Sequence, residues 1–447
     1  MKRLVTLLVT ALLMTAALCV SASAADYQSA AEDLSAIGMF RGTVNGGFEL
    51  DRAPKRSEAA IMLVRLYGAE EEAAAAYQSG EISHPFKDVG PIASPYVAWL
   101  YTKGITKGAT ATTFNSNAAC TDKNYVVFLL RALGYEDGKD FQYAESLTFA
   151  EKLGFYQADY FEGPFLRDDL AAITLQALAT DKKGGETYLL KSLIDTGAVD
   201  AKKAAALTGK IEAYRTLEKA SITLNTSSMD ALTTAEISGN VKYDGTSESM
   251  SIRSESRQKV ILSNDKVQIS SETTANQNGI SSKEGLWVKD GWAYYYSWDD
   301  DSGVVKVKTP YDDSMTLDDI QELDTRGLGL SSIQSISVQK SGSNTVYSLL
   351  VDYYAIFSVT GALDDLVSDS DLDSYAVSDI LVTYTLNSQG TIIRSTTEFS
   401  VDLTYKYPNS ADTLTMELDY VITTDVKATG ASVTISYPDF SEFVTVY

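Results

Sequence analysis

Apolar residues in the first half of the chain recur at the spacing of an amphipathic helix. Ala60, Leu63 and Val64 lie at positions i, i+3 and i+4, so they share one face of a helix. The same pattern recurs over 126–133 and over 171–178. A shorter helical pattern and a glycine-containing loop precede each stretch. The sequence therefore predicts three copies of one unit, made of a helix, a glycine loop and a second helix.

The first two copies match each other without a gap. The residue types of Gly38, Gly42 and Phe48 are repeated 66 positions later. Gly42 corresponds to Gly108, and Phe48 corresponds to Phe114. The third copy is weaker and has a loop five residues shorter. A single helix pair cannot bury its apolar stripe alone. We therefore expect the three copies to pack together as an all-α pseudo-threefold cluster.

The second half of the chain shows a different period. Apolar positions alternate with polar ones, as in Val346–Val351, and turn dipeptides such as Asn278–Gly279 and Asp290–Gly291 separate the runs. This pattern predicts a mostly antiparallel β domain, built as a curved sheet or half-barrel with one apolar face. Short helices are expected over 317–323 and 362–366, and a further strand over 433–435.

The N-terminus has the pattern of an export signal. Lys2 and Arg3 precede an apolar run over 4–20, and Ala22–Ala24 offers a small-residue cleavage site. No later apolar stretch is long enough to span a bilayer. The predicted multidomain organisation is a signal peptide at 1–24, repeats at 25–83, 84–138 and 139–182, a helical connector at 183–219 and a β-rich domain at 220–447.

Composition and charge narrow the range of functions. The chain has 37 basic and 60 acidic side chains, a net charge of −23, which repels nucleic acid and anionic lipid. His84 is the only histidine, so a two-histidine metal site is excluded. Cys120 is the only cysteine outside the apolar signal, so no disulfide is expected within the exported chain. We expect no cofactor and no catalysis.

Short motifs in the repeats suggest a family. The second copy contains Phe86–Val89, Gly104–Gly108 and Leu130–Gly134, and the first contains Lys55–Glu58 at the start of its second helix. These motifs resemble those of the S-layer homology domain over about 26–181. The resemblance implies an anchor for the cell wall, in which three units bind an anionic, often pyruvylated, secondary cell-wall polysaccharide.

The resemblance also implies which residues contact the polymer. The ligand-binding arginine of the family corresponds to Arg56 in the first copy and Arg167 in the third. In the second copy this position is an aspartate, and Lys123 follows it. Guanidinium groups bind carboxylates in a planar, bidentate manner, and glycine loops at Gly42 and Gly108 would expose backbone N–H groups nearby. These five residues are the predicted polymer-binding set.

The β domain carries a weaker resemblance. A strand at Trp292–Tyr296 after a Lys-Asp-Gly turn, a hairpin around 387–390 and the final Val433–Pro438 are similar to LolA- and LppX-type lipoprotein carriers. Such half-barrels hold acyl chains between a curved sheet and helices. The chain is therefore interpreted as an extracellular, wall-anchored protein that displays a β domain. The alternative is an extracellular carrier or sensor that binds an apolar ligand, and an enzyme acting on wall glycan ranks third.

Overall fold

A computed structural model of the chain describes residues 27–42, 47–157, 164–243, 245–263, 267–299, 303–311, 329–352, 372–406 and 413–446. The fold divides into two compact units. A helical unit contains Ser21–Glu212 together with Gly329–Gln334, and a β unit contains Ala213–Leu328 and Ser335–Tyr447 along with Met1–Val20. The predicted signal peptide lies outside the described residues.

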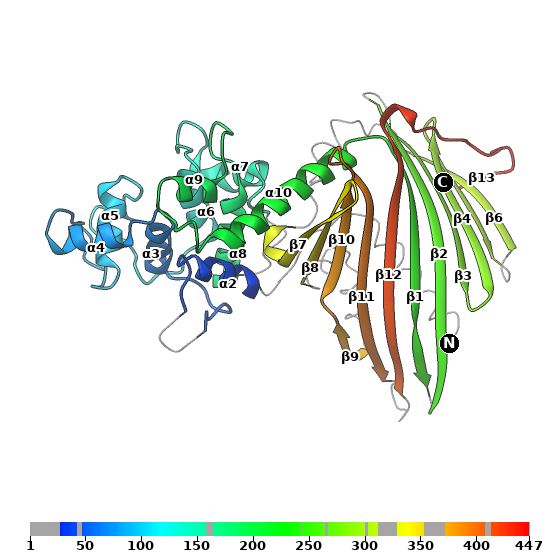
Figure 1. Cartoon of the computed structure of the whole chain (residues 1–447), viewed down its shortest axis with the longest axis horizontal. Coiled ribbons are helices and arrows are strands. Elements are labelled where there is room, and N and C mark those ends of the chain that lie inside the picture. Colours follow the sequence, from blue (N-terminus) through cyan, green and yellow to red (C-terminus); the bar gives the residue numbers. More distant parts are fainter. Residues whose placement is uncertain are drawn as a thin grey trace. The chain divides into compact units, whose positions relative to one another are not determined.

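The helical unit contains the three predicted copies as helix pairs (Figure 1). The second helix of each pair has its apolar stripe buried, and Leu63, Leu129 and Leu175 are completely inaccessible to solvent. The all-α prediction for this half is confirmed. The described helices are α2 (Gln28–Ala36), α3 (Arg56–Leu66), α4 (Glu70–Gln78), α5 (Ser94–Thr102), α6 (Asp122–Ala132), α7 (Ser146–Leu153), α8 (Arg167–Ala179), α9 (Leu189–Asp195) and α10 (Ala205–Asn225).

Local signals set several of these helix ends. The hydroxyl of Thr121 accepts a hydrogen bond from the backbone N–H of Asn124 and so caps α6. The carboxylate of Glu58 closes the first turn of α3 by accepting the N–H of Lys55 at 2.8 Å. Gly154 ends α7 with a φ of 83°, a conformation that favours glycine.

A short segment from the second half of the chain completes the helical unit. Leu330 and Ile333, on either side of a 3₁₀ turn (η3, Leu330–Ser332), are almost fully buried there. The N–H of Leu330 donates to the side-chain oxygen of Gln176 on α8 at 2.9 Å. The ammonium of Lys210 donates to Asp33 on α2 at 2.5 Å and to the carbonyl of Gln334 at 3.3 Å. The helical core therefore includes residues that the repeat pattern does not reveal.

The β unit is one large, curved, unclosed sheet (Figure 1). Its order is β13-β6-β5-β4-β3-β2-β1-β12-β11-β10-β8-β7, with β9 paired to β11. The described strands are β1 (Met229–Tyr243), β2 (Thr246–Leu262), β3 (Val267–Gln277), β4 (Ile280–Lys289), β5 (Trp292–Asp299), β6 (Gly303–Pro310), β7 (Ile333–Ser341), β8 (Asn344–Val351), β9 (Leu372–Val377), β10 (Ile380–Leu386), β11 (Ile392–Lys406), β12 (Thr413–Thr429) and β13 (Val444–Thr445).

Most neighbours in this sheet are antiparallel and are joined by tight hairpins. At Asn278–Gly279 and at Asp290–Gly291 both residues have positive φ, which matches the twist of the flanking strands. One face has the predicted apolar pattern, with Ile237, Leu418 and Leu403 at most 6% exposed. We call it the inner face and the opposite one the outer face. The predicted antiparallel, curved β domain is confirmed.

One prediction for the β domain is wrong, and another concerns residues that the structure does not describe. The segment 433–435 is not a strand, because its backbone pairs with no neighbouring strand among the described residues. It is an extended segment whose Thr434 carbonyl accepts from Lys259 on β2 at 2.9 Å. The helices expected over 317–323 and 362–366 lie outside the described residues.

Two glycines of the second copy allow a test of the loop packing. Gly104 and Gly108 both have positive φ, but only at Gly108 would a Cβ collide, at 2.2 Å from the ring of Phe86. We expect Gly104→Ala to cost about 1 kcal/mol through backbone strain alone. Gly108→Ala should cost about 2–4 kcal/mol because Phe86 must also move. Urea unfolding of the two variants checks this, and equal losses would contradict the close approach.

Candidate functional site

The three copies are joined at seams, each made by the start of a second helix and the loop of another copy. At the seam between the first and second copies, Arg56 donates from Nε to the carbonyl of Phe114 at 3.0 Å. Its guanidinium lies 5.0 Å from the centroid of the same ring. The N–H of Arg56 also donates to Ala118 at 2.9 Å. Arg56 thus joins two copies while its Nη groups have no carboxylate within 4 Å among the described residues.

The seam between the third and first copies repeats this arrangement. Arg167 donates from Nε to the carbonyl of Phe48 at 2.8 Å, and its backbone N–H donates to Arg52 at 3.0 Å. Its guanidinium lies 4.7 Å from the centroid of Phe40. The side chain is only 8% exposed, and burial lowers the pKa of Arg167. This arginine is therefore a buried cation that faces the first copy.

The seam between the second and third copies is built with the opposite polarity. Asp122 occupies the position of the seam arginines and accepts a hydrogen bond from the hydroxyl of Tyr156 at 2.8 Å. The next residue, Lys123, donates to the carbonyl of Ala144 at 3.1 Å and lies 5.9 Å from the centroid of Tyr143. The reversed charge predicted at this position is therefore satisfied by a tyrosine hydroxyl of the third copy.

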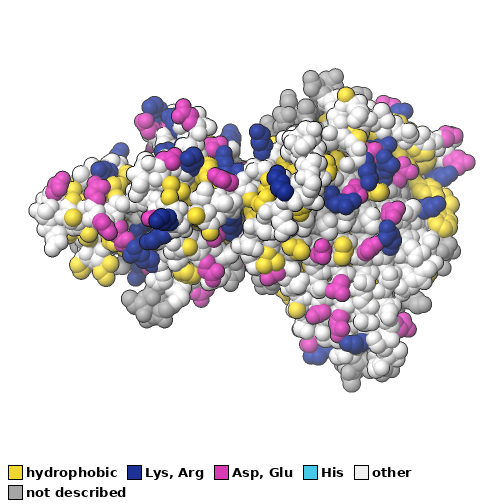
Figure 2. Space-filling view, in the orientation of Figure 1, with side chains coloured by type: hydrophobic (Ala, Val, Ile, Leu, Met, Phe, Trp, Pro, Cys, Tyr) yellow, Lys and Arg dark blue, Asp and Glu magenta, His cyan; other side chains and the backbone are white. Residues whose placement is uncertain are grey.

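A groove of about 830 Å³ opens along the first copy, and residues of the second and third copies complete its lining. One wall is cationic and the other is largely apolar. Figure 2 shows Lys and Arg side chains gathered over the part of the helical unit where α3 lies in Figure 1. The groove is lined by Met39, Phe40, Arg41, Gly42, Glu49, Arg52, Lys55, Ser57, Glu58, Ile61, Met62, Arg65, Gly90, Pro91, Ile92, Ala93, Ser116, Asn117, Arg167 and Leu170.

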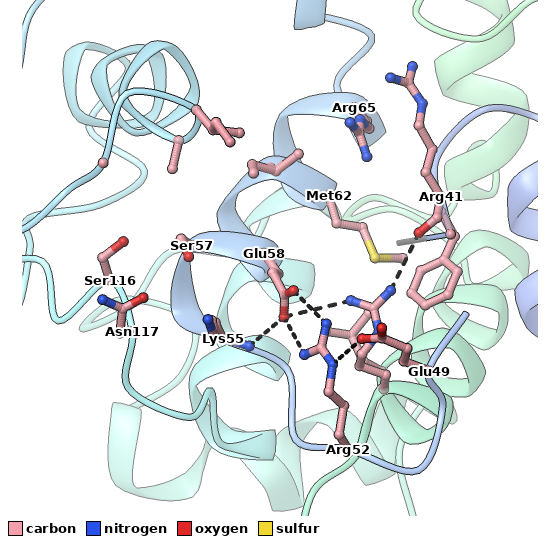
Figure 3. A pocket seen from close by; sticks show the side chains of 18 of the residues that line it. Arg41, Glu49, Arg52, Lys55, Ser57, Glu58, Met62, Arg65, Ser116 and Asn117 are labelled. Atoms are coloured by element: carbon pink, nitrogen blue, oxygen red, sulfur yellow. Dashed lines mark hydrogen bonds and ion pairs between the residues drawn. The ribbon is translucent and has the colours of Figure 1, made fainter. Parts of the chain in front are cut away.

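Glu58 lies at the centre of the cationic wall (Figure 3). Its carboxylate accepts two hydrogen bonds from Arg52, at 2.7 and 2.9 Å, and Nη1 of Arg167 lies 3.7 Å away. Burial acts to raise the pKa of Glu58, but the hydrogen bonds from Arg52 and from the N–H of Lys55, with the Arg167 charge, outweigh it and lower the pKa. Glu58 is thus a fixed anion that orients two guanidinium groups.

A second carboxylate orients the cations at the other end of the groove. Glu70 receives both Nη atoms of Arg41, at 3.1 and 2.6 Å, and Nε of Arg65 at 3.1 Å. Hydrogen bonding to Arg65 and to Tyr96 helps to lower the pKa of Glu70 against the opposing effect of burial. The arginines are therefore preorganised, and only part of their charge is neutralised.

Lys55 is the groove cation with the fewest constraints. Its side chain is exposed, and its ammonium forms no ion pair with any carboxylate that the structure describes. The groove lining contains five cationic side chains against the carboxylates of Glu49, which pairs with Arg52, and Glu58, while Glu70 beyond the lining pairs with two of the five cations. In a chain of net charge −23, this is a marked local excess of positive charge. An anionic group entering the groove would find Lys55 and the outer faces of the arginines.

The structure separates the five predicted polymer-binding residues. Gly42 and Arg167 line the groove, whereas Arg56 and Gly108 lie at the seam of the first and second copies and Lys123 at the third seam. The predicted residues thus do not form one site.

Sequence reasoning missed most of the cationic wall. The second copy has Lys107, Ala118 and Thr121 at the positions that match Arg41, Arg52 and Lys55 of the first copy. Because the three residues are not repeated, a search for residues shared by the copies could not find them. The available signal was a local excess of basic residues over 41–65 in an acidic chain.

The apolar wall gives the groove a second chemical character. Ile92 is 80% exposed at the rim, and Met62 and Phe40 are buried below. The described residues contain no cluster of three or more His, Cys, Asp or Glu side chains that could hold a metal ion. The arrangement can bind an extended ligand that has anionic groups along one side and C–H groups along the other.

Comparison with known families assigns part of the helical unit. Residues 85–121, in the second copy, match the family model of the S-layer homology domain. This segment is similar to the S-layer homology domain, and the similarity supports a cell-surface protein. The match indicates association with the cell wall or S-layer through the repeats, and it confirms the S-layer homology resemblance within the second copy.

Other comparisons add little. No curated protein matches the chain. A solved structure of a DUF1329 family protein from Desulfovibrio piger ATCC 29098 has 10% identity, covers 52% of this chain and 96% of its own, and has a TM-score of 0.16, too low to support an argument. The LolA-type resemblance stays a prediction. Within the described residues, no helix is long and apolar enough to cross a membrane.

The acidic seam predicts an unusual pH dependence of stability. Burial raises the pKa of Asp169 to about 7, and the charges of Asp168 and Asp122 act in the same direction. Because this pKa is above its usual 3.8, Asp169 favours folding at low pH, and that contribution is lost as the pH rises through about 7. Asp169→Asn should therefore gain roughly 2–4 kcal/mol of unfolding free energy relative to wild type between pH 4 and pH 8.

Denaturant unfolding across this pH range checks the effect. Asp200→Asn is the matched control, because backbone N–H groups of Lys203 and Lys202 lower the pKa of Asp200. Because the pKa of Asp200 in the folded chain lies below its usual 3.8, the stability difference between Asp200→Asn and wild type should stay nearly constant over this range. Parallel pH profiles for wild type and Asp169→Asn would contradict the prediction.

Proposed function

We propose that the helical unit holds the protein at the cell surface by binding an anionic secondary cell-wall polysaccharide in the groove that the three copies line together. The β unit would then be displayed outside the wall. The single observation that carries this proposal is the cationic wall of the groove, with five basic side chains against two carboxylates, in a strongly acidic chain. The S-layer homology match supports the same role.

The geometry suits a carboxylate-bearing glycan. Arginine presents planar, paired donors to a carboxylate, and Glu58 and Glu70 hold four of these side chains in place before any ligand arrives. Preorganisation reduces the entropy lost on binding. The exposed ammonium of Lys55, which pairs with no carboxylate that the structure describes, supplies a further positive charge in the lining. The apolar wall would pack against the ring C–H groups of the sugar.

The alternative of an apolar-ligand carrier has no comparable support. The inner-face side chains Ile237, Leu418 and Tyr405 are at most 5% exposed, as expected for a packed sheet. The carrier interpretation therefore stays a prediction from the sequence. No enzymatic activity is proposed.

A charge-neutralising variant at Lys55 tests the groove. Lys55→Gln should weaken binding of the mature chain to purified wall sacculi by about tenfold, the effect of losing one charge-assisted contact worth roughly 1.4 kcal/mol. The backbone N–H of residue 55, which bonds Glu58, is unchanged, so the fold should be retained. Co-sedimentation at graded salt concentrations measures the loss and should show a reduced salt dependence.

Lys191→Gln is the matched control, because Lys191 is an exposed lysine of the same unit, paired with Asp195 and absent from the groove. It should bind sacculi as wild type does. Sacculi stripped of their secondary polymer should bind neither protein. The proposal fails if the wild-type chain stays in the supernatant, or if Lys55→Gln and Lys191→Gln sediment equally well.

A further inference from the structure

One strand of the β unit carries aromatic residues at every second position. Trp292, Tyr294, Tyr296 and Trp298 alternate along β5, so all four share the outer face of the sheet. Each of them is partly exposed. A packed core explains aromatic side chains that are buried, but these four lie on the face opposite the apolar inner face. They form an aromatic column at the surface.

Lysines flank this column on both neighbouring strands. The ladder pairs Lys283 of β4 with Trp298, and Lys306 of β6 with Tyr296. The ammonium of Lys283 lies 6.0 Å from the centroid of Trp298, and that of Lys308 lies 5.0 Å from the centroid of Trp292. Contacts of this kind hold the ammonium groups beside the rings. We call the column and its lysines the aromatic–lysine face.

The charge of this face is opposite to that of the whole chain. Its positions on β4, β5 and β6, all of them described, include Lys283, Lys289, Lys306 and Lys308 but no Asp or Glu. Neither Lys283 nor Lys308 has an ion pair with a described carboxylate. Lys289 lies 4.0 Å from Asp290 and Lys306 pairs with Glu442, so Lys283 and Lys308 supply the local positive charge of this face in a protein of net charge −23.

The C-terminal segment braces the middle of the face and leaves other parts open. Phe440 stacks on Tyr294 with ring centroids 3.7 Å apart, and Glu442 pairs with Lys306. The N–H of Val446 donates to the carbonyl of Lys308 at 2.9 Å. Trp298, beside the exposed Lys283, has no such cover among the described contacts. The C-terminal segment therefore covers the face around Tyr294 and contacts it at several positions, and the end at Trp298 and Lys283 stays open among the described contacts.

We propose that the aromatic–lysine face is a second binding surface and that its ligand is an acidic polysaccharide. Aromatic rings pack against the C–H faces of pyranose rings, and lysine ammonium groups bind carboxylates along the same chain. Stacking and charge lie side by side here, so both can act on one polymer. This site is separate from the groove of the helical unit and does not depend on the function proposed for that groove.

The tryptophans provide a direct readout. Trp287, Trp292 and Trp298 lie on β4 and β5, and the remaining tryptophan, Trp99, is buried in the helical unit. Titration of the full mature chain with polygalacturonate should therefore change its intrinsic fluorescence. We expect saturable binding at about 0.15 M salt. Neutral dextran tests stacking without charge, and inorganic polyphosphate tests charge without sugar rings.

Variants assign the effect to this face. The double variant Lys283→Gln/Lys308→Gln should bind polygalacturonate about tenfold or more weakly, whereas Lys242→Gln, an exposed lysine of β1, should bind as wild type does. Trp298→Phe should reduce the fluorescence change. Lys55→Gln, which tests the groove, should leave this titration unchanged, so failure of one site can be told from failure of the other.

Three results would overturn the proposal. The first is no fluorescence change with polygalacturonate in the wild-type chain. The second is equal affinity for polyphosphate, which would show simple anion exchange, or for dextran, which would show that the lysines do not contribute. The third is an unchanged affinity in the double lysine variant when its circular dichroism and melting temperature match wild type.

Discussion

The helical unit depends on one type of contact, the docking of a helix start onto a phenylalanine loop of another copy. Arg56 donates to the carbonyl of Phe114, and Arg167 donates to that of Phe48. A cation at the first turn opposes the helix dipole and is costly to bury. The carbonyl acceptor and the aromatic ring offset that cost and link copies far apart in sequence. The groove lies where residues of all three copies come together through these contacts.

The same contact explains why the three seams differ in chemistry. Where the second and third copies meet, Asp122 replaces the arginine and accepts from Tyr156. Burial, aided by the charges of Asp168 and Asp122, raises the pKa of Asp169 nearby. Arg167, by contrast, is buried beside Glu58 and Arg52. Repeats that share one scaffold can therefore carry opposite charges at equivalent positions. In this chain five cationic side chains line one groove.

The two faces of the sheet in the β unit differ in the exposure of their side chains, and partly exposed aromatic residues line part of the outer face. Inner-face side chains such as Leu418 and Val382 are buried and contribute to the core of the sheet. The outer face carries the aromatic column of β5, which the C-terminal segment braces through Phe440. Residues at alternate positions of a strand lie on the same face of the sheet. The alternating aromatic residues of β5 therefore lie together on the outer face, beside the lysines.

The sequence alone determined the repeats, the helical and β halves, the hairpin turns at Asn278–Gly279 and Asp290–Gly291 and the acidic character of the chain, because periodicity and turn chemistry are local. Only the tertiary structure decided which cations meet. Arg167 lies more than a hundred residues from Arg41 and Arg52 in the sequence, and the packing of the third copy against the first brings it to the same groove. The insertion of Leu330 beside Gln176 is likewise a long-range contact that no local pattern encodes.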